Sequence, residues 1–152
     1  MENNDREIKP HTSQLLKELF KADSLDQYLQ NHKNDKEPAP LYVYLQELCR
    51  EQGKLPADII RKADLETSYG YQVFKGTRNP SRDTVLQLAF GFQATLNQAQ
   101  TLLRYASMSP LYPRVKRDAV VIYCLQHKIT LWDTQSILQE LELPMIGERK
   151  NG

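Results

Sequence analysis

The stretch that most constrains how this chain can fold is residues 59–81, which read IIRKADLETSYGYQVFKGTRNPS. An apolar pair precedes a short break at 64–66, an aromatic-rich segment ends at Gly76, and a basic loop ends at Pro80-Ser81. Glycine favours the left-handed end of a helix, and serine favours a helix start. The spacing therefore predicts two helices joined by a turn, a helix-turn-helix, followed by a loop and a further helix.

This spacing resembles the phage-repressor-like (Xre-type) DNA-binding family over about residues 41–98. In that family an apolar pair, a turn, a recognition helix closed by glycine and a basic loop with Pro-Ser follow one another at these intervals. The matching positions here are Ile59, Ile60, Leu65, Val73, Gly76, Pro80 and Ser81. The resemblance implies a five-helix domain that reads double-stranded DNA.

The composition limits the class of protein. A length of 152 residues with 40% hydrophobic and 26% charged residues is typical of one soluble globular domain with appendages. The longest apolar run, 119–125, is far below the ~18 residues of a membrane span, and the first residues have no apolar core of a signal peptide. We therefore expect a cytoplasmic protein without a membrane partner. The net charge of +1 means that any nucleic-acid binding needs a local basic surface.

Residues 1–40 are expected to precede the main domain. Residues 1–10 are polar and predict a disordered end. Thr12 or Ser13 can cap a short helix that runs to about Ala22, and Ser24 can cap a second one. Residues 31–40, NHKNDKEPAP, have the composition of a linker. This region is therefore predicted to be a short helical arm between a disordered end and a linker.

Residues 41–108 carry helix boundaries at the distances that a helix-turn-helix domain needs. Gly53 is placed to end one helix, and Pro56 suits the first turn of the next. Ser81 can cap a fourth helix, and residues 95–98 form a capping box for a fifth. These signals predict the five helices that the resemblance implies.

Residues 109–144 predict a C-terminal helical hairpin, packed on the domain or used for association. The run 119–125 suits a buried helix or a strand, and we favour a helix because no partner strand is evident. A last helix is expected to start at residues 130–133 and to end at Pro144. Its inward residues are predicted to be Trp132, Ile137, Leu138 and Leu141. With a flexible tail at 145–152, the predicted class is all-α.

Signals for catalysis are absent from the sequence. The six glycines are scattered, and no nucleophile elbow, zinc-protease motif or paired C-x-x-C occurs. Cys124 and His127 are three positions apart and could face a metal, but a buried thiol beside a surface histidine is the simpler interpretation. Cys49 and Cys124 are interpreted as reduced core residues. We expect no enzyme activity, no cofactor and no metal.

The resemblance implies which residues of the second helix, around 66–75, would reach the major groove. Mapped onto this chain, the base-contacting positions are Thr67, Ser68, Tyr71 and Gln72. Gln72 is the best candidate, because an amide can donate and accept together at an adenine edge. The alternative is an ordinary solvated helix face.

Basic residues after these positions are candidates for phosphate contact. Lys75, Arg78 and Arg82 give residues 67–82 a charge of +3 without an intervening acid. A second cluster, Arg114, Lys116 and Arg117, is expected in a first helical turn, where a bound anion would offset the positive end of the helix. Screening by the next residue, an aspartate, and by solvent is the favoured interpretation of that cluster.

Two functions follow from these observations. The first is sequence-specific DNA binding in transcriptional regulation. The second is a protein-interaction adaptor that keeps the scaffold without binding DNA, which tyrosine-rich surfaces such as Tyr69 and Tyr71 would suit. Helix-turn-helix proteins usually dimerise, and the arm or the C-terminal hairpin could supply a homodimer contact.

Overall fold

The computed structural model describes residues 12–34 and 39–147, and regular secondary structure in these ranges is entirely α-helical. This confirms the predicted all-α class. The chain divides into two compact units, Met1–Glu37 and Pro38–Gly152, which we call the N-terminal arm and the main unit. The expected disordered end at 1–10 lies outside the described residues.

The N-terminal arm contains two short helices, α1 (Thr12–Lys21) and α2 (Leu25–Asn31), as the sequence predicts. Ser24 begins α2 by accepting a hydrogen bond from the Gln27 amide. His32 links the helices, because its Nε2 lies 2.8 Å from Glu18 Oε2 and its ring lies 4.4 Å from that of Tyr28. Neither helix buries a residue, so the apolar side of this pair is left exposed.

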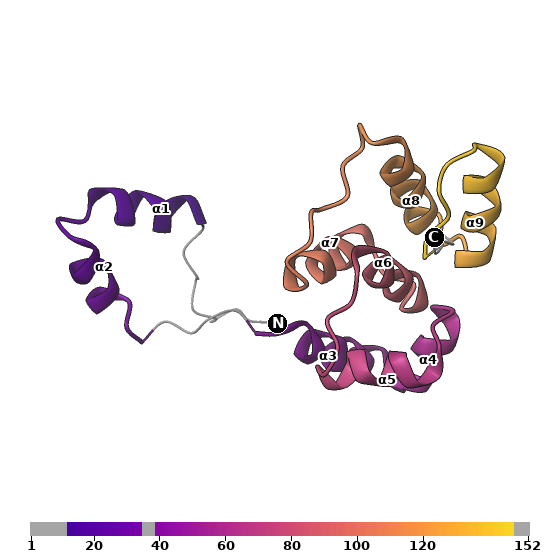
Figure 1. Cartoon of the computed structure of the whole chain (residues 1–152), viewed down its shortest axis with the longest axis horizontal. Coiled ribbons are helices and arrows are strands. Elements are labelled where there is room, and N and C mark those ends of the chain that lie inside the picture. The colour runs from indigo at the N-terminus through magenta and orange to yellow at the C-terminus, as the bar shows by residue number, and fades with distance from the viewer. Residues whose placement is uncertain (1–11, 35–38, 148–152) are drawn as a thin grey trace, which may run out of the picture. The chain divides into compact units, whose positions relative to one another are not determined.

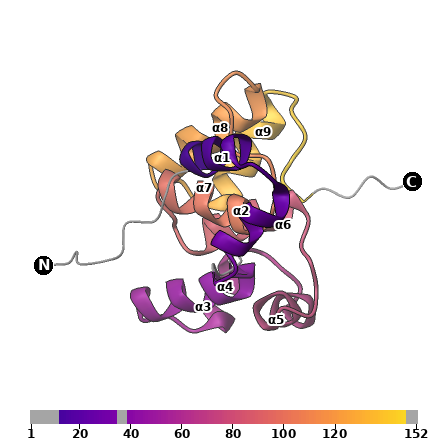
Figure 2. The same cartoon turned by 90° about the vertical axis from the view of Figure 1, so that its left-hand side faces the viewer.

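The main unit is built in three levels (Figures 1 and 2). The lowest level in these views holds α3, α4 and α5, the middle one holds α6 and α7, and the upper one holds α8 and α9. The bounds are α3 (Leu41–Gln52), α4 (Pro56–Lys62), α5 (Thr67–Lys75), α6 (Arg82–Gly91), α7 (Leu96–Tyr105), α8 (Lys116–Gln126) and α9 (Leu131–Glu140).

Local sequence signals account for most of these bounds. Gly53 ends α3 in the left-handed conformation with φ 65°, which costs little without a Cβ. Pro56 is the first residue of α4, where its missing N–H loses no bond. Ser81 accepts a hydrogen bond from the Thr84 amide at the start of α6. The predicted capping box at 95–98 is present at the start of α7.

Helix α6 is the centre of the main unit. Every residue from position 84 to its end is buried, and α4, α7 and α9 pack against it. The buried amide of Gln87 donates to the Ala63 carbonyl at 3.0 Å, which satisfies a polar group inside the core. One core therefore joins the predicted domain at 41–108 to the predicted hairpin at 109–144.

The C-terminal hairpin consists of α8 and α9, so residues 119–125 are helical as expected. The predicted inward set was partly wrong, because Trp132 is 52% exposed and Leu141 is also exposed. The helix starts at Leu131, and its buried side runs through Leu131, Thr134 and Leu138. Trp132 lies about 100° around the helix from Leu131, and farther from Thr134 and Leu138.

The segment after α9 differs from the flexible tail expected at 145–152. Ile146 is buried, and its N–H and C=O both bond to the side-chain amide of Gln135, at 2.8 and 2.7 Å. Arg117 donates to the carbonyl oxygens of Pro144 and Met145. Residues 145–147 are therefore packed against the main unit, and 148–152 lie outside the described residues.

Candidate nucleic-acid interface

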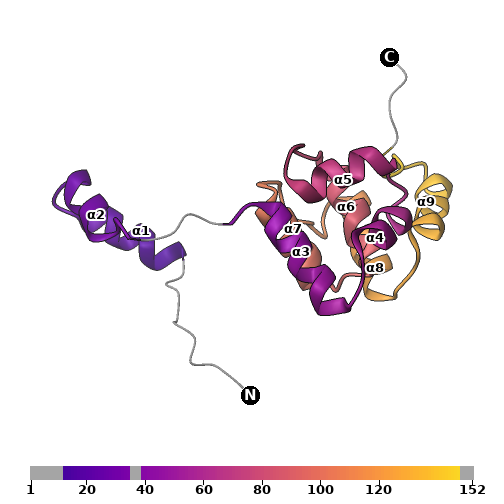
Figure 3. The same cartoon turned by 90° about the horizontal axis from the view of Figure 1, so that it is seen from below.

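Helices α4 and α5 pack closely (Figure 3), and Gly70 is the residue that permits this packing. A Cβ on Gly70 would lie 2.7 Å from Ile60 Cγ2, a separation that side-chain atoms do not tolerate. Val73 and Phe74 are buried on the same side of α5. The opposite side of α5 is therefore fixed as the outward surface.

Both ends of α5 are defined by local contacts. Glu66 caps the start, since its Oε2 accepts a 2.7 Å hydrogen bond from the Tyr69 amide. Gly76 ends the helix with φ 81°, and the ring of Tyr42 packs where a Cβ would project. The carboxylate of Glu66 therefore lies beside the outward side of α5, although Glu66 is not one of the predicted site residues.

The predicted base-contacting residues lie together on the outward side of α5. Thr67, Ser68 and Tyr71 are exposed, and Gln72 is half-buried. Lys75 follows one turn later and is exposed as well. Positions i, i+1, i+4, i+5 and i+8 share one side of a helix, so the periodicity in the sequence places this set correctly on one surface.

A groove with a volume of about 920 Å³ runs between α5 and the start of α6. Ser68 and Gln72 line it from α5, and Arg78 lines it from the loop. The start of α6 adds Ser81, and Gly147 of the C-terminal segment completes one wall. Thr67, Tyr71 and Lys75 are not among its lining residues. The predicted base readers thus divide between the groove and the outer edge of α5.

Arg78 is exposed, and its guanidinium carbon lies 5.6 Å from the centre of the Tyr69 ring. The hydroxyl of Tyr69 lies 3.3 Å from Thr84 Oγ1. Tyr69 therefore bonds to α6 through its hydroxyl and contacts the guanidinium of Arg78, in the loop, by a cation–π interaction. From the sequence, Tyr69 was predicted only as part of a protein-binding surface, because its contact with Arg78 depends on how the loop folds.

Arg82 is committed to contacts inside the main unit. Its guanidinium donates two hydrogen bonds to the buried carboxylate of Asp118, at 3.1 and 2.9 Å. It also donates to the carbonyl oxygens of Ser109 and Pro110. These partners use the donors that a phosphate would need, which leaves Lys75 and Arg78 as the exposed members of the predicted phosphate set.

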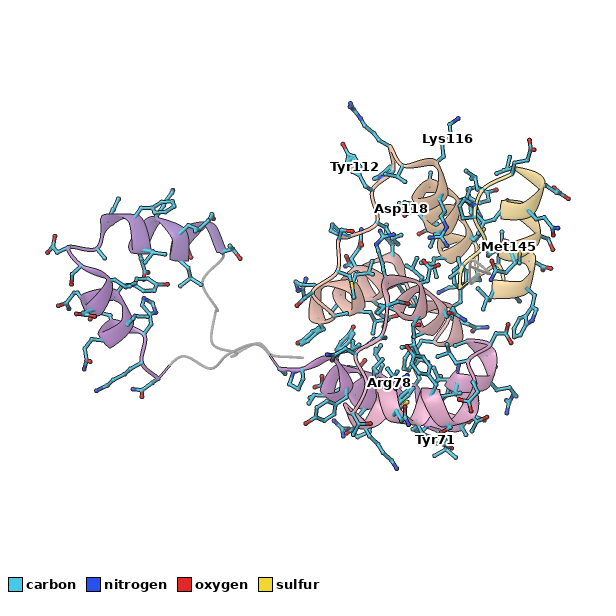
Figure 4. The ribbon with its side chains drawn as sticks, in the orientation of Figure 1. Tyr71, Arg78, Tyr112, Lys116, Asp118 and Met145 are labelled. Atoms are coloured by element: carbon cyan, nitrogen blue, oxygen red, sulfur yellow. The ribbon has the colours of Figure 1, made fainter. Side chains whose placement is uncertain are left out.

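The second predicted anion cluster is divided. Arg117 forms a two-bond pair with Asp83, each bond 2.9 Å long, and binds the C-terminal segment. Arg114 and Lys116 are exposed. Lys116 lies at the opposite end of the main unit from Tyr71 in Figure 4. Lys116 therefore lies away from the surface of α5, and the guanidinium of Arg117 is already paired.

The pairing of Asp83 makes the stability of the fold depend on pH. Burial raises the pKa of this carboxyl, but hydrogen bonds from the Arg117 side chain and the Gly147 amide, with the charges of Arg117 and Arg82, outweigh burial and lower it. The unfolded carboxyl titrates near 3.9, so this contribution to stability is complete above about pH 4. It is lost as the pH falls through the lower folded pKa.

We therefore expect Asp83→Asn to reduce the free energy of unfolding at pH 7 by about 1–3 kcal/mol. The difference between wild type and variant should shrink toward pH 3, because the Asp83 carboxyl of the unfolded chain takes up protons below about pH 4. Urea unfolding at pH 7, 4 and 3 measures this difference. Asp133→Asn, at an exposed position of α9, is the matched control. A wild-type advantage that stays constant down to pH 3 would contradict the assignment.

The described residues contain no cluster of three or more histidine, cysteine, aspartate or glutamate side chains that could hold a metal ion. Cys49 and Cys124 are buried free thiols, and burial raises the pKa of each. Both are thus protonated core residues at neutral pH. Among the helices of the described ranges, none combines the length and the apolar character needed to cross a bilayer.

Comparison of the chain with protein-family models, with curated proteins and with solved structures gives no match.

Proposed function

We propose that the main unit is a sequence-specific binder of double-stranded DNA that acts in transcriptional regulation. In this proposal α3 to α7 form a repressor-like five-helix domain, and α5 enters the major groove. The observation that carries it is the outward side of α5, where four polar residues share one surface while the other side packs on α4. Lys75 and Arg78 flank this surface with exposed positive charge.

The residues of α5 would have different roles. Gln72 and Ser68 line the groove, where an amide and a hydroxyl can bond to base edges. Thr67 and Tyr71, at the outer edge, would contact flanking bases or sugars. Arg78, held by Tyr69, would contact phosphate, and phosphate contacts position a protein without reading sequence.

Two substitutions separate these roles. Arg78→Ala should weaken binding to all duplexes alike, because one phosphate contact is lost. The slope of the logarithm of the binding constant against the logarithm of the salt concentration should fall in magnitude by about one. Gln72→Ala should change the preference at one base pair, by about 1–3 kcal/mol. The measurement is selection of bound sequences from random duplexes, followed by titration at several salt concentrations.

Lys116→Ala removes the same charge at the opposite end of the main unit and should leave binding unchanged. The same titration would reveal whether this second cluster contacts phosphate. Duplex binding that neither Arg78→Ala nor Gln72→Ala alters would exclude α5 as the DNA-reading helix.

A protein-interaction adaptor is the second candidate, and the charge distribution favours it. Asp118 neutralises Arg82, and Asp64 and Glu66 lie at the start of α5. Tyr71 is 38% exposed on the same surface, which suits contact with a protein. This function predicts no salt-dependent duplex binding, and a partner that is lost on Tyr71→Ala.

We further propose that two copies associate through the N-terminal arm, so that two domains can read two half-sites. In its described residues, 12–34, the arm exposes four large apolar side chains, of which Phe20 is 78% exposed; the others are Leu16, Leu25 and Leu29. Two short helices without a buried residue are only marginally stable, and pairing two copies would cover their apolar sides.

Phe20→Ser should weaken this association about 10- to 100-fold, because it removes a large apolar group from the proposed contact. Sedimentation equilibrium of the full chain measures the effect. Lys17→Ala, on the same helix, is the control. Trp132→Ala tests the C-terminal hairpin as the alternative contact. A chain that stays monomeric at high concentration would contradict the proposal.

A further inference from the structure

A cavity of about 170 Å³ lies on a different part of the main unit from the α5 surface. The ends of α4, α6 and α8, the loop after α8 and the start of α9 border it, and it opens to solvent beside Trp132. Its walls are mainly apolar, and the apolar lining residues are Phe90, Ala94, Leu125, Ile129, Leu131 and Trp132. Trp132, unexpectedly exposed for so large an apolar side chain, thus forms one wall of a concave site.

The charged side chains that line this cavity are both positive. Lys62, the last residue of α4, and Lys128, in the loop after α8, both line it, and no carboxylate does. The ammonium group of Lys128 donates to the Gln93 carbonyl at 3.0 Å, which fixes the loop beside the cavity. Helix α9 begins at this wall with Thr130 as its cap, so the positive end of its dipole adds to the same potential.

We propose that this cavity binds a small organic anion with a single apolar ring, of the monocyclic aromatic carboxylate class. Apolar walls around a space of about 150 Å³ are sufficient to hold a molecule as large as benzene. The two lysines would bind the carboxylate, and Trp132 would pack against the ring. The inference concerns ligand binding alone and does not depend on whether α5 binds DNA.

The chain contains a single tryptophan, so its fluorescence reports directly on this wall. Titration of the full chain with benzoate, without DNA, should change the Trp132 emission to saturation. Benzyl alcohol, which has the ring without the charge, should bind at least ten times more weakly. Acetate at equal ionic strength, which has the charge without the ring, should give no saturable change.

The lysines are tested by Lys62→Gln combined with Lys128→Asn. Asparagine suits position 128, where φ is 58°, because it tolerates the left-handed conformation better than most residues. The double variant should keep the wild-type emission without ligand, which shows that it is folded, and should bind benzoate at least tenfold more weakly. Arg114→Gln, at an exposed position that does not line the cavity, should bind like wild type.

A further readout and three possible outcomes decide between binding and no binding. Calorimetric titration of Trp132→Ala gives an affinity that does not rely on fluorescence, and it should also fall. A benzoate response that rises linearly without saturation, or an unchanged affinity in the double-lysine variant, would overturn the proposal. Equal affinities for benzoate and benzyl alcohol would likewise overturn it, because the cavity would then select for the ring alone.

Discussion

Replacing Asp118 with alanine is expected to lower the free energy of unfolding of the main unit by about 3–5 kcal/mol. The carboxylate is 4% exposed and accepts two hydrogen bonds from Arg82 and one from the Tyr112 amide. Its removal leaves a largely buried guanidinium with carbonyl oxygens as its only acceptors, and a main-chain N–H without an acceptor. Urea unfolding at pH 7 measures the loss.

The control for this experiment is Asp133→Ala, because Asp133 is an exposed aspartate in the first turn of α9. Its loss should cost less than about 1 kcal/mol. Replacing Arg82 and Asp118 together by Met and Leu should cost less than Asp118→Ala alone, since no charge is left without a partner. A small effect of Asp118→Ala would show that the pair does not join α6 to α8 in solution.

The second large effect is expected at Gly70. Alanine at this position should destabilise the main unit by about 1–3 kcal/mol. The sign of this change in the free energy of unfolding is informative. Replacing glycine with alanine inside a helix otherwise stabilises a protein by about 1 kcal/mol, because alanine has the higher helix propensity. A Cβ here meets the Cγ atoms of Ile60, which is buried and has no room to move away. The clash should therefore outweigh the gain.

Ser68→Ala, at an exposed position of the same helix, should change stability by no more than about 0.5 kcal/mol. Combining Gly70→Ala with Ile60→Ala should cost less than the sum of the two single changes, since the smaller side chain makes room for the new methyl group. Additive losses, or a stabilised Gly70→Ala variant, would show that α4 and α5 do not pack as closely as described.

Local sequence signals placed the helices within a few residues. Ser24, Ser81 and Thr95 accept the hydrogen bonds that begin α2, α6 and α7, and Gly53 and Gly76 take the left-handed conformation that ends α3 and α5. These interactions span three to five positions, so the local sequence contains everything they need.

The surface of α5 was predictable for a similar reason. Its candidate residues recur at the helical period, and the buried side of the helix is apolar between them. Periodicity gives the side of a helix that faces outward, but it does not give the partners of the charges on that side.

The remaining features depend on residues far apart in the chain. Arg82 meets Asp118 and Arg117 meets Asp83 across more than thirty positions, so two candidate anion contacts became ion pairs inside the main unit. The packing of Ile146 and the cavity beside Trp132 likewise arise where separate helices meet. Local sequence therefore decided where the helices begin and end and which side of a helix faces outward, because caps and periodicity act within a few residues. Only the tertiary structure decided which charges remain available to a ligand, because burial and ion pairing depend on neighbours that the chain brings together by folding.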